Sequence, residues 1–569
     1  MQNKQWVLKE QPDLDQVKAL RAQINVSEAV AIMLLQRGIT DFETAKLFFN
    51  PGMGQMYDPM LMEDMDKAVE RLIRAVTNEE KILIYGDYDV DGTTAVSMFY
   101  GFLSKHYPNI AYYIPDRYQE GYGVSTRGID YASKEGFSLI ISLDCGIKAE
   151  EKIVYARELG IDFIICDHHT PPRQLPPAYA ILDPKRTDCL YPYKELTGCG
   201  VGFKLLQAFA RHYDIEETEL FEYLDFLAVS TACDIVPITG ENRVLVSLGL
   251  QLLNESPRTG FHAMMEVAGY HNKELNVGDV LFGIGPRINA AGRIAHANHA
   301  VELLLCEDVD QALQFAQNVD QKNVTRREYD GAMTEEALHM IEQSGMAEMK
   351  STVLYKEDWH KGVVGIVASR CIEHYYRPTI ILTESNGKAT GSARSVKGFN
   401  IYNAIAECDE FLTQFGGHDF AAGMTLPIEN IPAFRQRFEE VVAGSISPDS
   451  LMPTVVIDTE ITLDQITWKF YNVLSRMAPF GPGNLQPLFV ARNVTLDRPP
   501  RLLKEKHLKL SVQQGGQRFD AIGFSMPHYY ARIQEVQQFD IAFHIDKNTF
   551  NGQTNLQLRL KDIKFSIAN

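Results

Sequence analysis

The sequence predicts an α/β protein of several domains, in which two α/β domains are joined by a helical connection and followed by a small β-barrel. Its 569 residues exceed what one hydrophobic core usually serves. From Lys81 onward, continuous runs of Ile and Leu alternate with segments of helical periodicity, a pattern typical of buried parallel strands and their crossover helices. Beyond Pro453, short alternating apolar runs replace this pattern and indicate a barrel.

These changes of pattern divide the chain into five segments. Residues 1–50 contain QINVSEAVAIMLLQRG, which predicts an amphipathic helix that caps the core. We expect an α/β domain over 51–250, a helical connector over 251–345 and a second α/β domain over 346–452. The last segment, 453–569, is expected to form an OB-fold.

The predicted elements follow in chain order. In the first domain KILIY, FSLIISL and IDFIIC predict parallel strands, and FEYLDFLAVSTAC predicts an apolar helix that ends at Ile-Val-Pro. In the second, WHKGVVGIVASRCIEHYY predicts a helix and PTIIL and GKATGSARS predict strands, followed by the glycine-rich FGGHDFAAG. Six short alternating runs predict a small antiparallel barrel: TVVIDTEI, PLFVARNVTL, HLKLSVQ, QRFDAIGF, FDIAFHI and NLQLRLKDI.

Composition narrows the class of protein. The hydrophobic fraction of 45% and the charged fraction of 23% are average for globular proteins, and no apolar run reaches the roughly 18 residues of a membrane-spanning helix. A cytoplasmic location without membrane association is therefore expected. The eight cysteines are scattered, which indicates free thiols and neither disulfides nor structural zinc.

The net charge of −19 argues against a nucleic-acid partner unless basic residues are clustered. Carboxylates that surround divalent cations would account for part of the excess. One local basic cluster is present near the C-terminus, at Arg498, Arg501, Lys504, Lys506, His507 and Lys509.

Acidic and imidazole side chains follow each predicted strand of the first domain. Asp87, Asp89 and Asp91 follow KILIY, Asp144 follows FSLIISL, and the segment Asp167-His168-His169 follows IDFIIC. Since ligands of such sheets bind beyond the carboxyl ends of the strands, we expect these side chains to meet at one edge. Asp234, at the end of the apolar helix, is expected to join them.

Oxygen-rich ligands with one imidazole favour two Mn²⁺ or Mg²⁺ ions that share a bridging carboxylate. A calcium loop is the alternative for DYDVDG, but the Glu that an EF-hand requires is missing. The chemistry predicted for such a centre is hydrolysis of a phosphodiester without a covalent intermediate.

DYDVDG, LDCG, DHH and ACDIVP resemble, in order and spacing, the four motifs of the DHH phosphoesterase superfamily. The resemblance implies that Asp89 and Asp91 each hold one metal, that Asp144 bridges, and that His168 and Asp234 complete the second ion. His169 would face the scissile phosphate, and Asp167 would orient the two histidines. Related phosphatases have a His where this chain has Tyr85, so Asp87 is our candidate for the remaining ligand.

Further segments resemble the RecJ family within this superfamily: IPDR, EGYG, GPRINAAGR, WHKGVVGIVASR and APFGPGNLQP. GSARS and GGHDFAAG resemble the second domain, DHHA1, of the DHH–DHHA1 arrangement. The resemblance implies substrate-binding roles for Arg117, Tyr122, Arg287, Asn289, Arg293, His360, Arg370, Arg394, Gly416, Gly417 and His418. A tight turn for the GGH segment and salt bridging for Arg287 and Arg293 remain open as structural alternatives.

The resemblance also implies 5′→3′ digestion of single-stranded DNA to mononucleotides in recombination and repair, beside a single-strand-binding protein and a helicase. A channel between the two α/β domains, with basic groups at its closed end, would explain preference for a single strand. Two other functions stay open: a short-oligonucleotide or cyclic-dinucleotide phosphodiesterase of the same superfamily, and a catalytically silent single-strand-binding scaffold.

Overall fold

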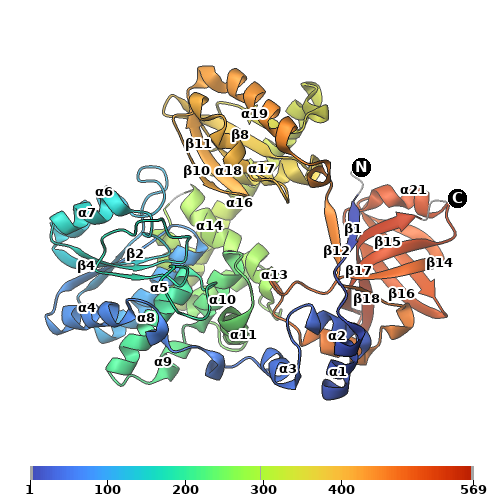
Figure 1. Cartoon of the computed structure of the whole chain (residues 1–569), viewed down its shortest axis with the longest axis horizontal. Coiled ribbons are helices and arrows are strands. Elements are labelled where there is room, and N and C mark those ends of the chain that lie inside the picture. The colour runs from blue at the N-terminus through green and yellow to red at the C-terminus, as the bar shows by residue number, and fades with distance from the viewer. Residues whose placement is uncertain (1–3, 295, 566–569) are drawn as a thin grey trace.

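The computed structural model describes residues 4–294 and 296–565. Figure 1 shows a first α/β domain, a second one above it and a C-terminal barrel to the side, beside which the N-terminal helices lie. The predicted class of two α/β domains followed by an OB barrel is confirmed.

A five-stranded, fully parallel sheet forms the centre of the first domain. Its order is β3 (Ile110–Tyr113), β2 (Lys81–Gly86), β4 (Phe137–Leu143), β5 (Asp162–Cys166) and β6 (Ala180–Leu182). The chain passes from β2 to β3 on one side and returns to β4 on the other. This reversal is a topological switch point, and such sheets bind ligands at the carboxyl ends of the strands there.

Helices cover both faces of this sheet because successive strand residues point to opposite faces. Ile82 and Ile84 pack on the side of α4 (Met65–Thr77), α5 (Val90–His106) and α8 (Gly198–His212). Leu83 and Ile140 pack on the side of α6 (Thr126–Glu135) and α7 (Glu150–Glu158). Burial on both faces explains why these strands are continuously apolar in sequence.

A helical region follows, made of α10 (Leu224–Cys233), α11 (Gly240–Glu255), α12 (Thr259–Val267), α13 (Val277–Asp279), α14 (Gly285–Ile294), α15 (Asn298–Leu305) and α16 (Val309–Gln343). Phe261, Leu304 and Val319 share the core of the first domain. The helices predicted as a connector from residue 251 therefore belong largely to that core, and the C-terminal half of α16 makes the connection. There Ala337 and Ile341 pack against Val367 of the second domain.

The second domain has a mixed sheet in the order β10 (Gln414–His418), β11 (Ala421–Leu426), β9 (Lys388–Arg394), β8 (Thr379–Ser385) and β7 (Thr352–Tyr355). Only β7 and β8 run parallel. Its helices are α17 (Val364–His374), α18 (Ile401–Ala406) and α19 (Ile431–Ser445). The helix predicted from Trp359 thus begins at Val364, and the glycine-rich segment forms the β10–β11 hairpin.

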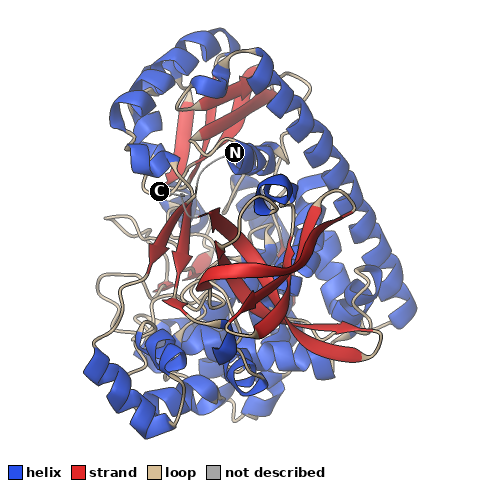
Figure 2. Cartoon of the chain, turned by 90° about the vertical axis from the view of Figure 1, so that its right-hand side faces the viewer, coloured by secondary structure: helices blue, strands red, loops and turns tan. Residues whose placement is uncertain are grey.

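The C-terminal barrel closes through β14 (Phe489–Leu503), β15 (His507–Gln514), β16 (Gln517–Gly523), β17 (Phe539–Phe550) and β18 (Gln553–Phe565). Figure 2 views the molecule from the barrel side. The antiparallel prediction is wrong for two pairs of this sheet: β16 runs parallel to β18, and β13 (Thr459–Glu460) runs parallel to β14. Because β17 is antiparallel to both β14 and β18, closure requires β18 to run in the direction of β16.

The N-terminal segment packs on this barrel. It contains β1 (Gln5–Leu8), α1 (Leu14–Ile24), α2 (Glu28–Leu35) and α3 (Phe42–Phe49), and β1 pairs in parallel with β12 (Thr454–Ile457). Leu20 and Leu34 lie in the barrel core with Phe489. The helix predicted from QINVSEAVAIMLLQRG is present as α2 but is shorter than that segment, because left-handed Asn25 ends α1 and the Ser27 side chain caps α2.

No helix in the described ranges 4–294 and 296–565 is both long and apolar enough to cross a membrane. All eight cysteines are free thiols.

Candidate active site and metal centre

The predicted site lies at the carboxyl edge of the parallel sheet. Asp87 directly follows β2, Asp89 caps the N-terminus of α5 by accepting the Gly92 N–H at 3.1 Å, and Asp91 lies in the first turn of α5. Asp144 follows β4, and the two histidines follow β5. Asp234 is the C-cap of α10. Side chains that are distant in sequence are thus brought to one point by the strand order.

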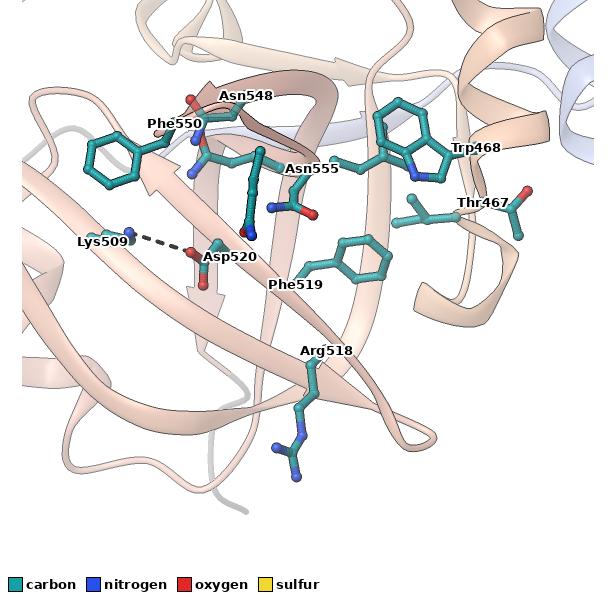
Figure 3. A pocket seen from close by; sticks show the side chains of 13 residues that line it. Thr467, Trp468, Lys509, Arg518, Phe519, Asp520, Asn548, Phe550 and Asn555 are labelled. Carbon is teal, nitrogen blue, oxygen red and sulfur yellow. Dashed lines mark ion pairs between the residues drawn. The ribbon is translucent and has the colours of Figure 1, made fainter.

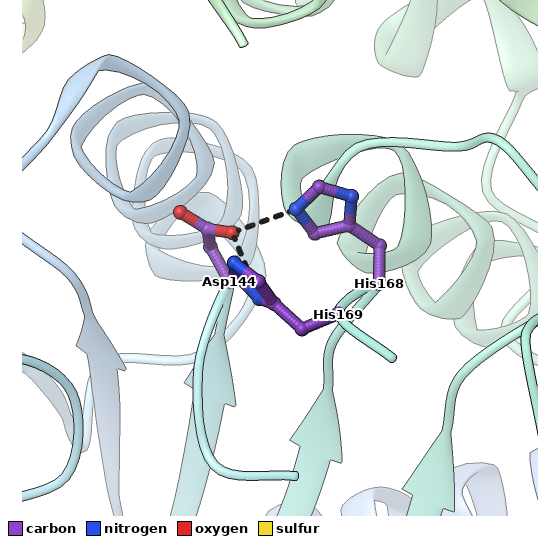
Figure 4. Close-up of side chains that lie close together, drawn as sticks. All are labelled: Asp144, His168 and His169. Atoms are coloured by element: carbon purple, nitrogen blue, oxygen red, sulfur yellow. Dashed lines mark ion pairs between the residues drawn. The ribbon is translucent and has the colours of Figure 1, made fainter. Parts of the chain in front are cut away.

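His168 is at the centre of this cluster. Its Nε2 lies 3.1 Å from Asp144 Oδ1, 3.5 Å from Asp234 Oδ2 and 3.8 Å from Asp91 Oδ2. Figure 4 shows one carboxylate oxygen of Asp144 facing both imidazoles, at 3.1 Å from His168 Nε2 and 4.0 Å from His169 Nδ1. His168 is only 5% exposed.

The ligand atoms form two groups suited to one ion each. Asp87, Asp89 and Asp144 make one group, and Asp91, His168 and Asp234 make the other; within each, the ligand atoms lie within 4.8 Å of one another. Asp144 also groups with the two histidines, so its carboxylate lies between the two positions. This is the arrangement in which one carboxylate can bridge two ions.

The donor atoms fit divalent cations because several have no other partner. Both carboxylate oxygens of Asp87, Oδ1 of Asp144, Oδ2 of Asp234 and both ring nitrogens of His168 are buried without a hydrogen bond of ordinary geometry. Leaving one such group unsatisfied costs about 1–3 kcal/mol, and more when it is charged. A cluster of this kind is stable when cations bind to it.

The pKa shifts of the clustered side chains also favour metal binding. Burial, reinforced by the charges of Asp91 and Asp89, raises the pKa of the Asp144 and Asp234 carboxyls well above their usual values. Burial also lowers the pKa of His168 to about 4, so its imidazole is neutral at physiological pH. Neutral imidazole is the form that binds a metal.

The N-terminus of α8 holds Asp91 in place. The Gly198 and Cys199 N–H groups donate to its carboxylate at 2.6 and 3.0 Å, and the Ser230 hydroxyl donates at 2.6 Å. A Cβ on Gly198 would lie 2.5 Å from the Asp144 Cα. The sequence prediction missed these residues, although a helix that begins with Gly-Cys-Gly is a signal for close backbone approach.

Asp167 orients His169. Its Oδ1 lies 2.7 Å from the His169 Nδ1 and also accepts the His168 and His169 N–H groups, while Oδ2 accepts the Ile147 N–H at 3.0 Å. Burial by itself would lower the pKa of His169, but the hydrogen bond and charge of Asp167 outweigh it and raise that pKa. The remaining nitrogen, Nε2, lies 3.2 Å from the Tyr122 hydroxyl.

Tyr85 lies on the other face of β2. It is fully buried, and its hydroxyl donates to the Gly123 carbonyl at 3.1 Å and accepts the Ser125 N–H at 3.1 Å. The position that holds a His in related phosphatases therefore supplies no ligand here. Asp87, directly after β2, is placed to supply one.

A group of four arginines lies between the two α/β domains. Arg117 stacks over the Tyr88 ring at 5.0 Å, Arg293 donates to the Gly362 carbonyl at 2.9 Å, and Arg394 donates to the Ser392 hydroxyl at 2.6 Å. Burial, together with the charges of Arg117, Arg326 and Arg394, lowers the pKa of Arg293 to about 10. We call Arg117, Arg293, Arg326 and Arg394 the arginine cluster; mutual repulsion within it favours binding of an anion.

Arg326, on α16, is the member that the sequence prediction missed. Its Nε is buried without a hydrogen-bond partner. Only the packing of α16 against both domains brings it to Arg293, since no motif surrounds it in the sequence.

The other predicted substrate-binding residues lie on different elements of the two α/β domains. His360 lies in the turn before α17, and Asn289 is half-buried on α14. Gly416, Gly417 and His418 form part of β10 in the second domain. Burial, together with the charges of Lys148 and His169, lowers the pKa of His418. Because these two charges belong to the first domain, β10 lies close enough to the carboxyl edge of the parallel sheet to interact with it electrostatically.

Two predicted arginines are engaged elsewhere. Arg287 Nε pairs with Asp320 at 2.9 Å and its Nη1 donates to the Gly283 carbonyl at 2.6 Å. Arg370 lies 3.6 Å from Asp330 and is half exposed. The salt bridge that we left open as an alternative is present at Arg287. It is largely buried rather than on the surface, and it joins α14 to α16.

The strand β6 also ends in a carboxylate that the prediction missed. Asp183 is fully buried and accepts the Lys185 N–H at 2.7 Å, and burial raises its pKa to about 7. Its carboxylate is in neither ligand group. Asp183 Oδ1 therefore helps to hold the loop after β6, outside the two proposed ion positions.

The barrel carries a groove of about 570 Å³ between β15, β16 and the β17–β18 hairpin. Figure 3 shows Trp468, Phe519 and Phe550 around it, with Lys509 and Arg518. Trp468 and Phe550 are 46% and 72% exposed. Exposed rings beside basic groups suit a single strand of nucleic acid.

Comparison with protein families matches three segments of the chain. Residues 81–231 match the DHH family, N-terminal domain; residues 348–444 match the DHHA1 domain; and residues 457–562 match the RecJ OB domain.

Two curated relatives are similar over most of the chain. The single-stranded-DNA-specific exonuclease RecJ of Bacillus subtilis (strain 168) is 37% identical over 560 residues, which are 98% of this chain and 70% of that protein. The protein of the same name from Escherichia coli (strain K12) is 34% identical over 523 residues, 88% of this chain and 90% of that one.

Among solved structures, RecJ from Thermus thermophilus in complex with Mn²⁺ superposes with a TM-score of 0.85 at 26% identity, over 99% of this chain and 80% of that chain. The complex of the same protein with Mg²⁺ gives a TM-score of 0.79. These are the two ions that the ligand types predict.

Proposed function

The chain belongs to the RecJ family of the DHH phosphoesterase superfamily, and from this premise we propose that it is an exonuclease that hydrolyses single-stranded DNA 5′→3′ to mononucleotides in recombination and repair. One observation carries the proposal: the buried carboxylates and imidazoles at the switch point form two adjacent ligand groups, and Asp144 of the first also groups with His168 of the second. Such a centre suits phosphodiester hydrolysis.

Two bound Mn²⁺ or Mg²⁺ ions would supply a nucleophile of lowered pKa and neutralise charge that develops on the phosphate. In the proposed assignment, Asp87, Asp89 and Asp144 hold one ion, and Asp91, His168 and Asp234 hold the other with Asp144 shared.

The protein's own residues orient the substrate. Asp167 fixes the His169 ring through Nδ1, which leaves Nε2 to donate a hydrogen bond to the scissile phosphate. The raised pKa of His169 favours the protonated imidazole, whose charge stabilises the phosphate as negative charge grows. Tyr122, which contacts Nε2, lies where the substrate must enter.

The arginine cluster supports recognition of a strand end. Rings connect it to the catalytic edge, because Tyr88 beneath Arg117 contacts Tyr122, and Tyr122 contacts His169, each with centroids 6.2 Å apart. In the proposed geometry, the strand passes between the two α/β domains, and the guanidinium groups hold its terminal phosphate.

The barrel groove would hold the strand farther from its end through stacking and basic contacts. Local basic surfaces of this kind allow DNA binding in spite of the net charge of −19. A cytoplasmic site of action beside a helicase and a single-strand-binding protein belongs to the same proposal, since these proteins produce and cover single strands.

The test is digestion, with Mn²⁺, of one oligonucleotide labelled at either end, beside a blunt duplex. We expect a labelled mononucleotide from the 5′-labelled strand, progressive shortening of the 3′-labelled strand and no loss of duplex. Asp144→Ala should abolish turnover while strand binding persists. If only di- to pentanucleotides or cyclic dinucleotides are cut, the enzyme is the alternative phosphodiesterase. Equal digestion of duplex and single strand would contradict the channel.

A further inference from the structure

Three aromatic rings meet where the first domain, α16 and the second domain adjoin. The rings of Tyr329 and His360 are stacked, with centroids 4.9 Å apart and planes at 15°. Tyr118 meets His360 edge-on at 6.4 Å. Tyr329 is 42% exposed and Tyr118 is 40% exposed. Both tyrosine rings are therefore partly accessible to a ligand at this junction.

The rings are anchored to the arginine cluster. The Tyr118 hydroxyl donates to the Arg293 carbonyl, and the Arg293 guanidinium donates to the Gly362 carbonyl at 2.9 Å. A Cβ on Gly362 would lie 2.7 Å from the Arg293 carbonyl oxygen, 2.8 Å from the Tyr118 hydroxyl and 3.0 Å from His360 Cε1. The absence of a side chain at Gly362 therefore allows the rings and Arg293 to meet.

The helix α16 presents a cation and a ring on one face. Arg326 and Tyr329 are three residues apart, a spacing at which helical side chains are neighbours. Arg326 belongs to the arginine cluster and its Nε has no hydrogen-bond partner. A ligand held by the guanidinium groups would thus have the open face of Tyr329 beside it.

The stack is held in a fixed orientation. His360 Nδ1 accepts the Gly362 N–H at 3.1 Å, which sets the ring plane that supports Tyr329. Burial, together with the charge of Arg117, lowers the pKa of His360 and keeps its imidazole neutral. A neutral ring can support Tyr329 without adding repulsion to the arginine cluster.

We infer that Tyr329, supported by His360, is a stacking platform for the base of the terminal nucleotide, whose phosphate the arginine cluster holds. This inference rests on the proposed function and specifies how the strand end is recognised. Because every base has an aromatic face, such a platform would recognise the presence of a terminal base without regard to its identity.

The test compares two 5′-phosphorylated single strands that differ only in the first residue, which is a normal nucleotide or a tetrahydrofuran abasic residue. The rate of the first cleavage is measured under single-turnover conditions, with enzyme below saturation. The wild-type protein should cut the normal strand about tenfold faster, the order expected for one base–aromatic stack. Tyr329→Ala should lose that tenfold on the normal strand and change little on the abasic one.

Two further variants make the result specific. Tyr329→Phe keeps the ring and should restore the discrimination. Tyr213→Ala removes a tyrosine of similar exposure, 39%, at the end of α8, and should leave the discrimination intact. If Tyr329→Ala slows cleavage of both strands equally, or of neither strand, the inference that Tyr329 is a stacking platform is refuted. The proposed exonuclease function would be unaffected by that result. A wild-type protein that cuts neither strand would overturn the proposed function and the platform with it.

Discussion

The contact between Asp167 and His169 gives a sharp prediction for Asp167→Asn. The carboxylate and the His169 Nδ1 are 2.7 Å apart, so the wild-type hydrogen bond is charge-assisted whenever the imidazole is protonated. The asparagine carbonyl can keep the position of Oδ1, but the negative charge that stabilises the imidazolium is lost. That loss is worth about 2–3 kcal/mol in the transition state, which corresponds to about a 30- to 150-fold lower kcat.

The test requires that Asp167→Asn still folds, so that a lower kcat reports the lost charge and not unfolding. The asparagine amide would face the Ile147 N–H in place of Oδ2, which costs about 1–3 kcal/mol of stability. Thermal unfolding therefore accompanies the kinetics. The assay is progressive shortening of a 3′-labelled single strand at saturating DNA and Mn²⁺, with the manganese content measured on the same samples.

Asp183→Asn is the matched control. Asp183 is also a buried aspartate at a strand end, but it contacts the Lys185 N–H instead of an imidazole. We expect its kcat to stay within about twofold of the wild-type value, because Asn is isosteric and the pKa of this carboxyl is already raised by burial. A kcat within about twofold for Asp167→Asn as well, at full manganese content, would refute the orienting role of Asp167.

Three further predictions concern metal, stability and pH. Each bound Mn²⁺ should stabilise the wild-type protein by about 2.7 kcal/mol at 100 times its Kd. Calorimetric titration of Asp87→Asn should show that one of the two ions binds more weakly; two unchanged affinities would contradict the assignment of Asp87. Arg243→Met should lower the free energy of unfolding in urea by about 3–5 kcal/mol. The buried guanidinium donates hydrogen bonds to four backbone carbonyls, those of Phe48, Met477, Ala478 and Pro479. A loss below about 1 kcal/mol would contradict this prediction. Burial, together with the charge of Arg559, lowers the pKa of His544 in the barrel to about 4, below its unfolded value. The neutral imidazole therefore contributes stability above about pH 6.5, and this contribution, about 2–3 kcal/mol, is lost as pH falls toward 4. The loss should be absent in His544→Gln, and parallel curves of stability against pH for the two proteins would refute it.

The fold class and the chemistry of the site could both be predicted from the amino-acid sequence. Continuous apolar strands can be buried only within a two-sided sheet, and each was followed by residues that bind hard cations. Since parallel strands end at one edge, the meeting of Asp87, Asp144 and His168 followed from sequence order and strand period.

Other features had no local signal in the sequence. Residues up to Val319 joined the first core, and the N-terminal helices joined the barrel, because apolar faces bury against whichever surface tertiary packing brings to them. The parallel pair β16–β18 was decided by closure of the barrel, which short alternating runs do not specify.

The functional details that depend on distance also needed the tertiary structure. Gly198 and Ser230 hold Asp91 from positions more than one hundred residues away, and Arg326 meets Arg293 only through the packing of α16. Residue type and spacing therefore predicted which groups could bind metal and phosphate. The path of the chain decided which of them meet, because contacts between remote segments depend on how whole elements pack and leave no period in the sequence.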